Sequence, residues 1–262
     1  METVNSSQTF VISSDDAQSI SRHFAVEGET SLVLLIEGNK KIDLELEVSA
    51  AQDSRMTFLL INHNGEAVNL RDSYHLSGGS DSVIAYCQLN DYPLEADSEY
   101  HLDGQGAVLK VQNAAMTSNE KTFRQNTLHS ERNTTANINN YGIAMKGGSC
   151  DFDVRNRINK GCHGSETHQT SRILTYDAQS KGRILPVLYI DDNDVRASHA
   201  ATMGQPDRDQ IFYMQTRGLS YQEAMKLITV GYLLPVSEVI DDEKTNSLLR
   251  QEIETKVSEC LS

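Results

Sequence analysis

The chain contains no tryptophan, only 6 phenylalanines and few basic residues for its 262 residues. Without many large rings, its core has to be built mainly from Leu, Ile and Val, which suits thin β-layers. The 23 Lys and Arg residues face 37 Asp and Glu residues, so the formal net charge is −14. A nucleic-acid site needs clustered cations, and anionic membranes attract them too. We therefore expect neither nucleic acid nor membrane as a partner, but other proteins.

Cysteines and long apolar runs are also scarce. The 4 cysteines form no CxxC pair and are too sparse for a disulfide scaffold, which fits a reducing compartment. The longest apolar run near the start, residues 32–36, is far too short to span a bilayer. The first residues lack the basic and apolar stretches of a secretory signal. We therefore expect a cytoplasmic protein.

Common catalytic motifs are missing as well. The sequence has no GxGxxG, no phosphate-binding GxxxxGK[ST], no HExxH and no GxSxG. The glycine pair at 147–148 fits a turn between strands better than a phosphate cradle. The acids Asp191, Asp192 and Asp194 cluster, but a solvated turn explains them more simply than a catalytic site. We expect no enzymatic activity and no permanently bound cofactor.

Between about residues 31 and 190 the apolar residues recur with a period of two or in short runs, which predicts β-strands. The clearest alternation places apolar residues at 42, 44, 46 and 48 with acids between them. Many short strands with closely spaced turns are typical of a sandwich, a barrel or a solenoid. No repeat of fixed period is visible, so the pattern alone leaves a sandwich and an irregular β-helix equally open. Residues 1–30 receive no assignment.

Residues 201–262 change to helical patterns and predict a C-terminal helical domain. The first helix is expected to begin at Pro206 and Asp207, with the proline in its first turn, and to end at Gly218. The second begins with a capping box at residues 220–223 and ends at Pro235. Its expected apolar face consists of Ala224, Leu227, Ile228 and Gly231.

A third helix is expected from about Asp242 to the end of the chain. Its apolar stripe is Leu249, Ile253 and Val257, continued by residue 260 or 261. Charged residues fill the positions between them, as in a helix with one buried face.

The segment 162–168 holds the densest set of side chains that can bind a metal. Thiolate and imidazole suit borderline and soft metals. Adjacent residues of an extended strand point to opposite faces, however, so Cys162 and His163 would not share an ion there. A turn or strand without a ligand role is the favoured interpretation. Cys150 is expected to be a small buried apolar residue, as free cysteines usually are.

His199 lies where the strand pattern gives way to the helices. On its own it fits a junction residue whose hydrogen bonds are satisfied. At an interface, its neutral imidazole is suited to move a proton or to ligate iron.

Several segments, in the same order, resemble the SufB/SufD family of iron–sulphur cluster assembly proteins, and SufD more closely. The segment 167–174 is similar to the family's HQTNRNLLL strand and 184–190 to its PxLxI strand. The segment 192–204 resembles DDVKCSHGATVG, and 210–218 resembles QLFYLRSRGI. A Thr-rich strand entry at residues 133–136, after His129, completes the set, and the match covers roughly residues 123–234.

The resemblance implies a mainly β fold: a right-handed parallel β-helix core followed by a C-terminal helical domain. The expected division is an N-terminal segment 1–30, a core 31–200 and helices 201–262. Family members pair through the last rungs of the core, as a SufB–SufD heterodimer or a homodimer. Each helical domain docks the ATPase SufC, so ATP would act only through that partner. A transient iron–sulphur cluster at the pair is implied.

The motif matches imply roles for particular residues of this chain. His199 occupies the histidine implicated in cluster assembly at the pairing interface. Phe212, Tyr213, Arg217 and Gly218 fall in the block that belongs to the SufC-docking domain, although helix packing explains the two aromatic residues equally well.

This sequence also departs from the family pattern. The cysteine of the motif is Ala197 here, and the glycine after the histidine is Ala200. The chain is much shorter than a typical SufD, and most of the N-terminal region is expected to be missing. A structural subunit that needs a cysteine-bearing SufB-like partner is the leading hypothesis.

Two alternatives stay open. Within the family, the chain is a minimal SufB-like scaffold that binds the cluster itself as a homodimer, with Cys150 or Cys162 as ligands and His163 as a further candidate. Outside it, the chain is a carbohydrate-active enzyme on a β-solenoid, which predicts a carboxylate pair or a basic cleft in a long groove.

Overall fold

A computed structural model describes residues 2–261 as sixteen strands followed by three α-helices. The strands are β1 (Glu2–Val4), β2 (Gln8–Ser13), β3 (Ser19–Val26), β4 (Glu29–Glu37), β5 (Ile42–Ala50), β6 (Arg55–Asn62), β7 (Val68–Leu76), β8 (Asp81–Gln88), β9 (Leu94–Leu102), β10 (Val108–Thr117), β11 (Glu120–His129), β12 (Thr135–Ala144), β13 (Ser149–Ile158), β14 (Glu166–Thr175), β15 (Lys181–Ile190) and β16 (Arg196–Gly204). The helices are α1 (Arg208–Thr216), α2 (Tyr221–Leu233) and α3 (Glu243–Cys260), with a short 3-10 helix η1 (Leu234–Ser237) after α2.

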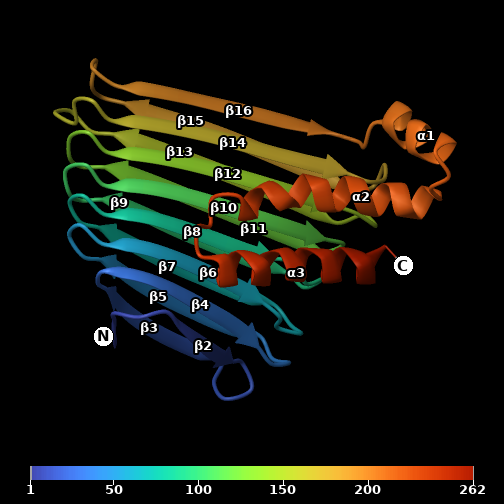
Figure 1. The fold of residues 1–262 in the computed structure, drawn as a ribbon, viewed down its shortest axis with the longest axis horizontal. Coiled ribbons are helices and arrows are strands. Elements are labelled where there is room, and N and C mark those ends of the chain that lie inside the picture. Colours follow the sequence, from blue (N-terminus) through green and yellow to red (C-terminus); the bar gives the residue numbers. More distant parts are fainter. Residues whose placement is uncertain (1, 262) are drawn as a thin grey trace.

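The strands alternate between two sheets as the chain winds. Sheet A contains the odd-numbered strands from β1 to β15 and sheet B the even-numbered strands from β2 to β16, each in chain order. Every pairing between described strands is parallel. The result is a parallel β-solenoid of about seven turns, and Figure 1 shows its rungs rising from the N-terminal strands to β16. The predicted solenoid with a helical C-terminal part is therefore confirmed, and the sandwich is excluded.

The length of one turn increases along the chain. A side-chain hydrogen bond from Asn69 to Asp43 joins adjacent rungs 26 residues apart, whereas the equivalent bond from Arg183 to Asp151 spans 32 residues. The added residues lie in the turns, because the strands stay in register. This drift explains why no fixed period is visible in the sequence.

The first 26 residues belong to the solenoid. Strand β2 pairs with β4, and β3 pairs with both β1 and β5. The segment left unassigned by the sequence therefore supplies the first rungs. At the other end, the last strand extends to Gly204 and the first helix begins at Arg208.

Apolar side chains fill the space between the two sheets. The alternation read in β5 is confirmed, because Ile42, Leu44, Leu46 and Val48 all lie in this interior and are at most 2% exposed. Aromatic rings contribute more than the composition suggested. Tyr74 and Tyr100 stack with their centroids 5.5 Å apart, close to the spacing of adjacent strands. In-register rungs thus let a few rings form continuous contacts.

Helices α2 and α3 cover the outer face of sheet B, where they cross the strands side by side (Figure 1). The predicted stripe of α3 is confirmed, since Leu249, Ile253 and Val257 are fully buried against this face. Sheet B is therefore apolar on both faces, which explains continuous runs such as that of β6. Helices α2 and α3 thus lie on the solenoid, whereas α1 extends beyond the ends of the strands and packs against α2 (Figure 1). Among the described residues, no helix is long and apolar enough to span a membrane.

The helix boundaries agree with the predicted caps, with two differences. The capping box at Ser220 is present. Gly218 follows the C-cap of α1 and has a φ of 97°, in the left-handed region. Pro206, however, precedes the N-cap Asp207 and does not lie in the first turn. The expected apolar face of α2 was wrong in part: Leu227 is exposed, because the helix is rotated so that residues 225, 229 and 233 are buried.

A buried carboxyl group lies in the interior between the two sheets. Asp72 accepts hydrogen bonds from the hydroxyl groups of Tyr74 at 3.0 Å and Tyr86 at 2.5 Å. Burial raises the pKa of Asp72 to about 6, although these donors and Ser98 oppose the shift. The folded state therefore binds a proton that the unfolded chain has released near pH 5.

We predict a pH-dependent effect for Asp72→Asn. A folded-state pKa above the unfolded value contributes stability that is present below about pH 4 and is lost as the pH rises through about 6. The full effect is about 3 kcal/mol. In urea unfolding from pH 4 to 8, the stability of the variant relative to the wild type should rise by up to that amount. Asp97→Asn, at an exposed ion pair with Arg124, is the control. Parallel pH curves for both variants would contradict the assignment.

Candidate functional site

The last rung of the solenoid leaves a long strand edge open. β16 pairs with β14 on one side only, and all nine of its residues are exposed. β15 is likewise the last strand of sheet A. Edge strands present unpaired backbone N–H and C=O groups that can pair with another chain. At the opposite end, the edge strands β1 and β2 have three and six residues.

His199 faces the interior side of this open end. It pairs in register with Gln169, whose side chain is buried inside the solenoid. Since side chains alternate along a strand, Ala197, Ala201 and Met203 share that side. Ala197, the position of the family cysteine, thus belongs to the same inward row as His199. Within residues 2–261, the ring of His199 has no hydrogen-bonding partner.

Hydrogen bonds from Gln169 of β14 hold the two sheets together directly beneath His199. The Gln169 amide donates to the carbonyl oxygens of Val154 and Val187, both at 3.2 Å, and so bridges the two sheets. At the far end of the rung, a Cβ built on Gly182 would lie 2.5 Å from the Met203 sulfur. No larger residue fits there without a shift. The open end is therefore a packed surface, with the imidazole of His199 near its middle.

The outward side of β16 is held by polar contacts. His168 Nδ1 lies 2.7 Å from the hydroxyl oxygen of Ser198, and Arg196 donates to Glu166 at 3.0 Å. Two outward side chains of β16, Arg196 and Ser198, are thus engaged by β14, whereas the ring of His199 on the inward row has no such contact among the described residues.

The predicted metal-capable residues do not converge. Cys150 is buried at the start of β13, where burial raises its pKa to about 12. Cys162 lies in the turn beyond the other end of that strand, and its thiol donates to the carbonyl oxygen of His129. Eight residues of strand separate Cys150 from Ile158, or about 26 Å. His163 is exposed and pairs with Asp192 at 3.0 Å. These three residues do not form one site.

The exposed residues of α1 form a second candidate surface. Phe212 and Tyr213 are 68% and 58% exposed, so the helix-packing explanation of these rings is wrong. Ile211 instead provides the packed face, against Ala224 of α2. Arg217 lies over the Tyr213 ring at 5.2 Å and donates to its hydroxyl oxygen.

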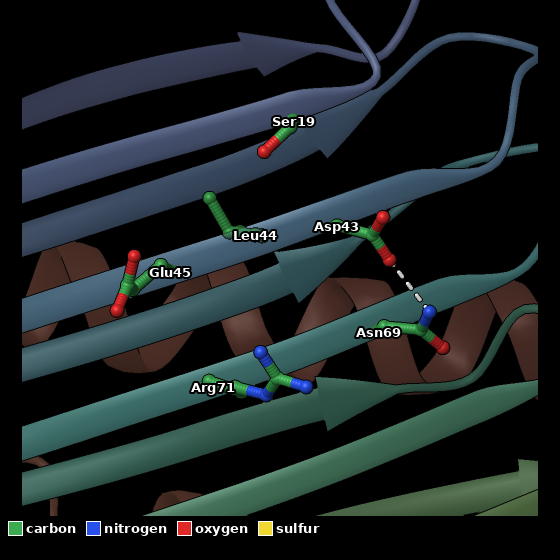
Figure 2. A pocket seen from close by; sticks show the side chains of 6 residues that line it. All are labelled: Ser19, Asp43, Leu44, Glu45, Asn69 and Arg71. Atoms are coloured by element: carbon green, nitrogen blue, oxygen red, sulfur yellow. Dashed lines mark hydrogen bonds between the residues drawn. The ribbon is translucent and has the colours of Figure 1, made fainter.

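A shallow hollow on the outer face of sheet A tests the enzyme alternative. Figure 2 shows it between β3, β5 and β7, with a volume of about 270 Å³ and with Asp43 accepting a hydrogen bond from Asn69 at 2.6 Å. Glycoside hydrolysis needs one carboxyl group with a raised pKa beside a second carboxylate. Asp72, whose pKa is raised by burial, lies inside the solenoid and does not line this hollow.

Comparison with known proteins identifies the family to which this solenoid belongs. The family model described as "SUF system FeS cluster assembly, SufBD core domain" matches residues 10–232. The chain belongs to the SufBD core family. It is 29% identical over 183 residues to the iron–sulphur cluster assembly protein SufD of Bacillus subtilis, and 26% identical over 234 residues to SufD of Escherichia coli. SufB of Bacillus subtilis is 23% identical over 133 residues.

These alignments span most of this SufBD chain but about half of its relatives. They cover 68% and 74% of the chain, against 42% and 54% of the two SufD proteins. The resemblance to SufB and SufD, closer to SufD, is confirmed. The activities and partners of the whole relatives stay proposals for this chain.

One group of residues was not singled out in the sequence: His75, His101 and Asp103 on the outer face of sheet A. The available signal was a repeated tripeptide, Tyr-His-Leu, at residues 74–76 and 100–102. Its 26-residue offset equals the length of a turn in that part of the solenoid.

Proposed function

We propose that this SufBD chain is a non-catalytic scaffold subunit of a SUF-type iron–sulphur cluster assembly complex. It pairs through β15 and β16 with a SufB-like subunit or a second copy, and α1 docks a SufC-like ATPase. ATP acts only through that partner, and a cluster resides on the pair transiently. The assembly works in the cytoplasm, in keeping with four free cysteines. The single observation that carries the proposal is the open last rung with its inward-facing imidazole.

The open rung supports pairing for an energetic reason. A second solenoid whose last strand meets β16 in a similar direction would satisfy its unpaired backbone groups and bury its inward row. Ala197, Ala201 and Met203 present apolar surface there, and burying apolar surface favours association. Met203 is 56% exposed in the isolated chain. A flat interface of this kind places His199 between the two cores.

His199 is suited to work with groups from the partner. Its ring is free, and a neutral imidazole nitrogen is a ligand for iron. Ala197 supplies no thiolate on the same row. A cluster at this rung therefore needs sulfur ligands from the other subunit, which favours a SufB-like partner that carries the cysteine. Cys150 gives little support to the alternative of a self-sufficient scaffold, because it is buried with a strongly raised pKa.

The α1 surface supports docking of a second protein. Two large aromatic side chains are held apart from the solenoid on a helix whose opposite face is packed. Aromatic and arginine side chains dominate the energetics of many interfaces. The Tyr213 and Arg217 pair orders this face before binding, which lowers the entropy lost on docking.

For pairing, we predict that Ala201→Asp weakens association with a SufB-like subunit at least tenfold. The inward position would place a carboxylate in the buried part of the interface, at a cost of several kcal/mol. Thr202→Asp, one residue along and on the outward side, is the matched control and should change the affinity less than threefold. Analytical ultracentrifugation measures both, with circular dichroism to verify folding. Equal weakening by the two variants would argue against an inward-row interface.

For docking, we predict that Phe212→Ser with Tyr213→Ser abolishes binding of a SufC-like ATPase and its stimulation by this chain. Each exposed ring is expected to contribute about 2 kcal/mol or more as an interface anchor. Tyr92→Ser, at an exposed ring away from α1, is the control. Retained stimulation in the double variant would remove α1 from the proposal.

For cluster assembly, we predict that His199→Ala leaves folding and pairing intact but impairs cluster maturation in cells. His168→Ala, on the outward row of the adjacent strand, should have no effect on maturation. The measurement is the activity of a cluster-dependent reporter enzyme in a strain that depends on this chain. Unchanged maturation with His199→Ala would exclude a role for the imidazole while leaving the pairing proposal standing.

A further inference from the structure

We propose that the outer face of sheet A carries a binding site for a divalent first-row transition metal ion, formed by His75, His101 and Asp103. One ligand atom from each residue lies within 4.8 Å of the other two. The site is on the long face of the solenoid, away from the open rung and from α1. It therefore goes beyond the proposed pairing and docking functions and does not depend on them.

Parallel register brings the two histidines together. His75 of β7 pairs with His101 of β9, and both side chains point outward. Their rings stack with centroids 4.7 Å apart and planes only 5° apart. That separation is the spacing of adjacent strands, so the backbone itself holds the rings at this distance. Asp103 follows β9 directly, and its Oδ2 lies 2.9 Å from Nδ1 of His75.

The remaining ring nitrogens are already engaged, in equivalent ways. Nε2 of His75 lies 3.3 Å from the Ser73 hydroxyl oxygen, and Nε2 of His101 lies 3.3 Å from a Glu99 carboxylate oxygen. Ser73 and Glu99 are themselves register partners, so the rings face the same way. Both Nδ1 atoms therefore turn toward the strand ends, where Asp103 lies.

These contacts prepare the Nδ1 atoms as ligands. When Nε2–H of His101 donates to Glu99, the lone pair of that ring is on Nδ1. A carboxylate or hydroxyl partner on the other ring nitrogen is the usual support of a metal-bound histidine. The ion would take the place of the proton now shared between His75 and Asp103.

Two imidazoles and one carboxylate suit zinc and its neighbours in the first transition row rather than calcium or magnesium, which prefer oxygen. Ligand atoms about 2.1 Å from a tetrahedral ion lie about 3.4 Å apart. Pairs of ligand atoms now up to 4.8 Å apart therefore have to close by at most about 1.4 Å, and the 2.9 Å pair of His75 and Asp103 has to open by about 0.5 Å. They are free to do so, because the His75 and Asp103 side chains are 41% and 44% exposed. Water would fill the remaining position.

The surroundings attract cations. Next to the site is a surface hollow of about 580 Å³ whose lining includes Glu45, Glu47, Asp97 and Glu99, together with Arg71. A concave surface with an excess of carboxylates raises the local concentration of a divalent ion. A stacked histidine pair without a ligand role would not require these acidic neighbours.

The test is a titration of the reduced 262-residue chain with cobalt(II) chloride under argon, followed by its visible absorption. We expect one ion per chain, with the weak d–d bands of a nitrogen–oxygen site. His75→Ala and His101→Ala should each weaken binding at least tenfold. His23→Ala is the matched control, because this histidine pairs with Glu47 on the same face of sheet A.

Thermal unfolding gives a second measurement. A saturating zinc(II) concentration should raise the Tm of the wild type and of His23→Ala, but not that of His75→Ala. Cobalt–thiolate charge-transfer bands would assign the ion to a cysteine and overturn the proposal. Binding that His101→Ala leaves unchanged, or no binding above that of a His75→Ala, His101→Ala double variant, would overturn it too.

Discussion

The ladder of backbone hydrogen bonds between successive turns is the constraint on which the rest of the structure depends. Each internal strand is satisfied from both sides by the turns before and after it, with parallel registers of eight to ten residues in most rungs. A parallel ladder has no internal end. Wherever the turns stop, a full row of N–H and C=O groups is left. At the end that follows the last turn that row is β16, and the position of His199 on its inward side follows from the same register.

The same ladder determines what the side chains can do. Positions one turn apart stack at the strand spacing, which produces the Tyr74 and Tyr100 pair in the interior and the His75 and His101 pair outside. Inside, burial in this apolar layer raises the pKa of Asp72, against the opposing effect of its tyrosine donors; outside, the stack aligns two imidazoles beside acidic neighbours. The helices then close the outer face of sheet B, where each fully buried Leu, Ile or Val contributes about 1.5–3 kcal/mol. The last rung, α1 and the outer side of sheet A stay open.

Much of this could be predicted from the sequence, and the exceptions have physical reasons. The alternation in β5 and the capping box at Ser220 depend on neighbouring residues, so local patterns show them. The solenoid itself required the family resemblance, because turns that lengthen from 26 to 32 residues hide the repeat. The face of α2 was misjudged in part, since its burial is decided by sheet B and not by its own periodicity. The cluster of His75, His101 and Asp103 depends on pairing between turns, which no window along the chain contains.

The central claim is that the last rung is open in the isolated chain and closed by a paired solenoid. Amide hydrogen exchange, read by mass spectrometry on peptides that cover residues 135–204, tests it most directly. The account predicts fast exchange in the isolated chain for the β16 amides that do not donate to β14, slow exchange for β12, and strong protection of those β16 amides once a SufB-like subunit is added. Outward-edge amides of β16 that are already protected at low protein concentration, or that exchange equally fast in the pair, would contradict it.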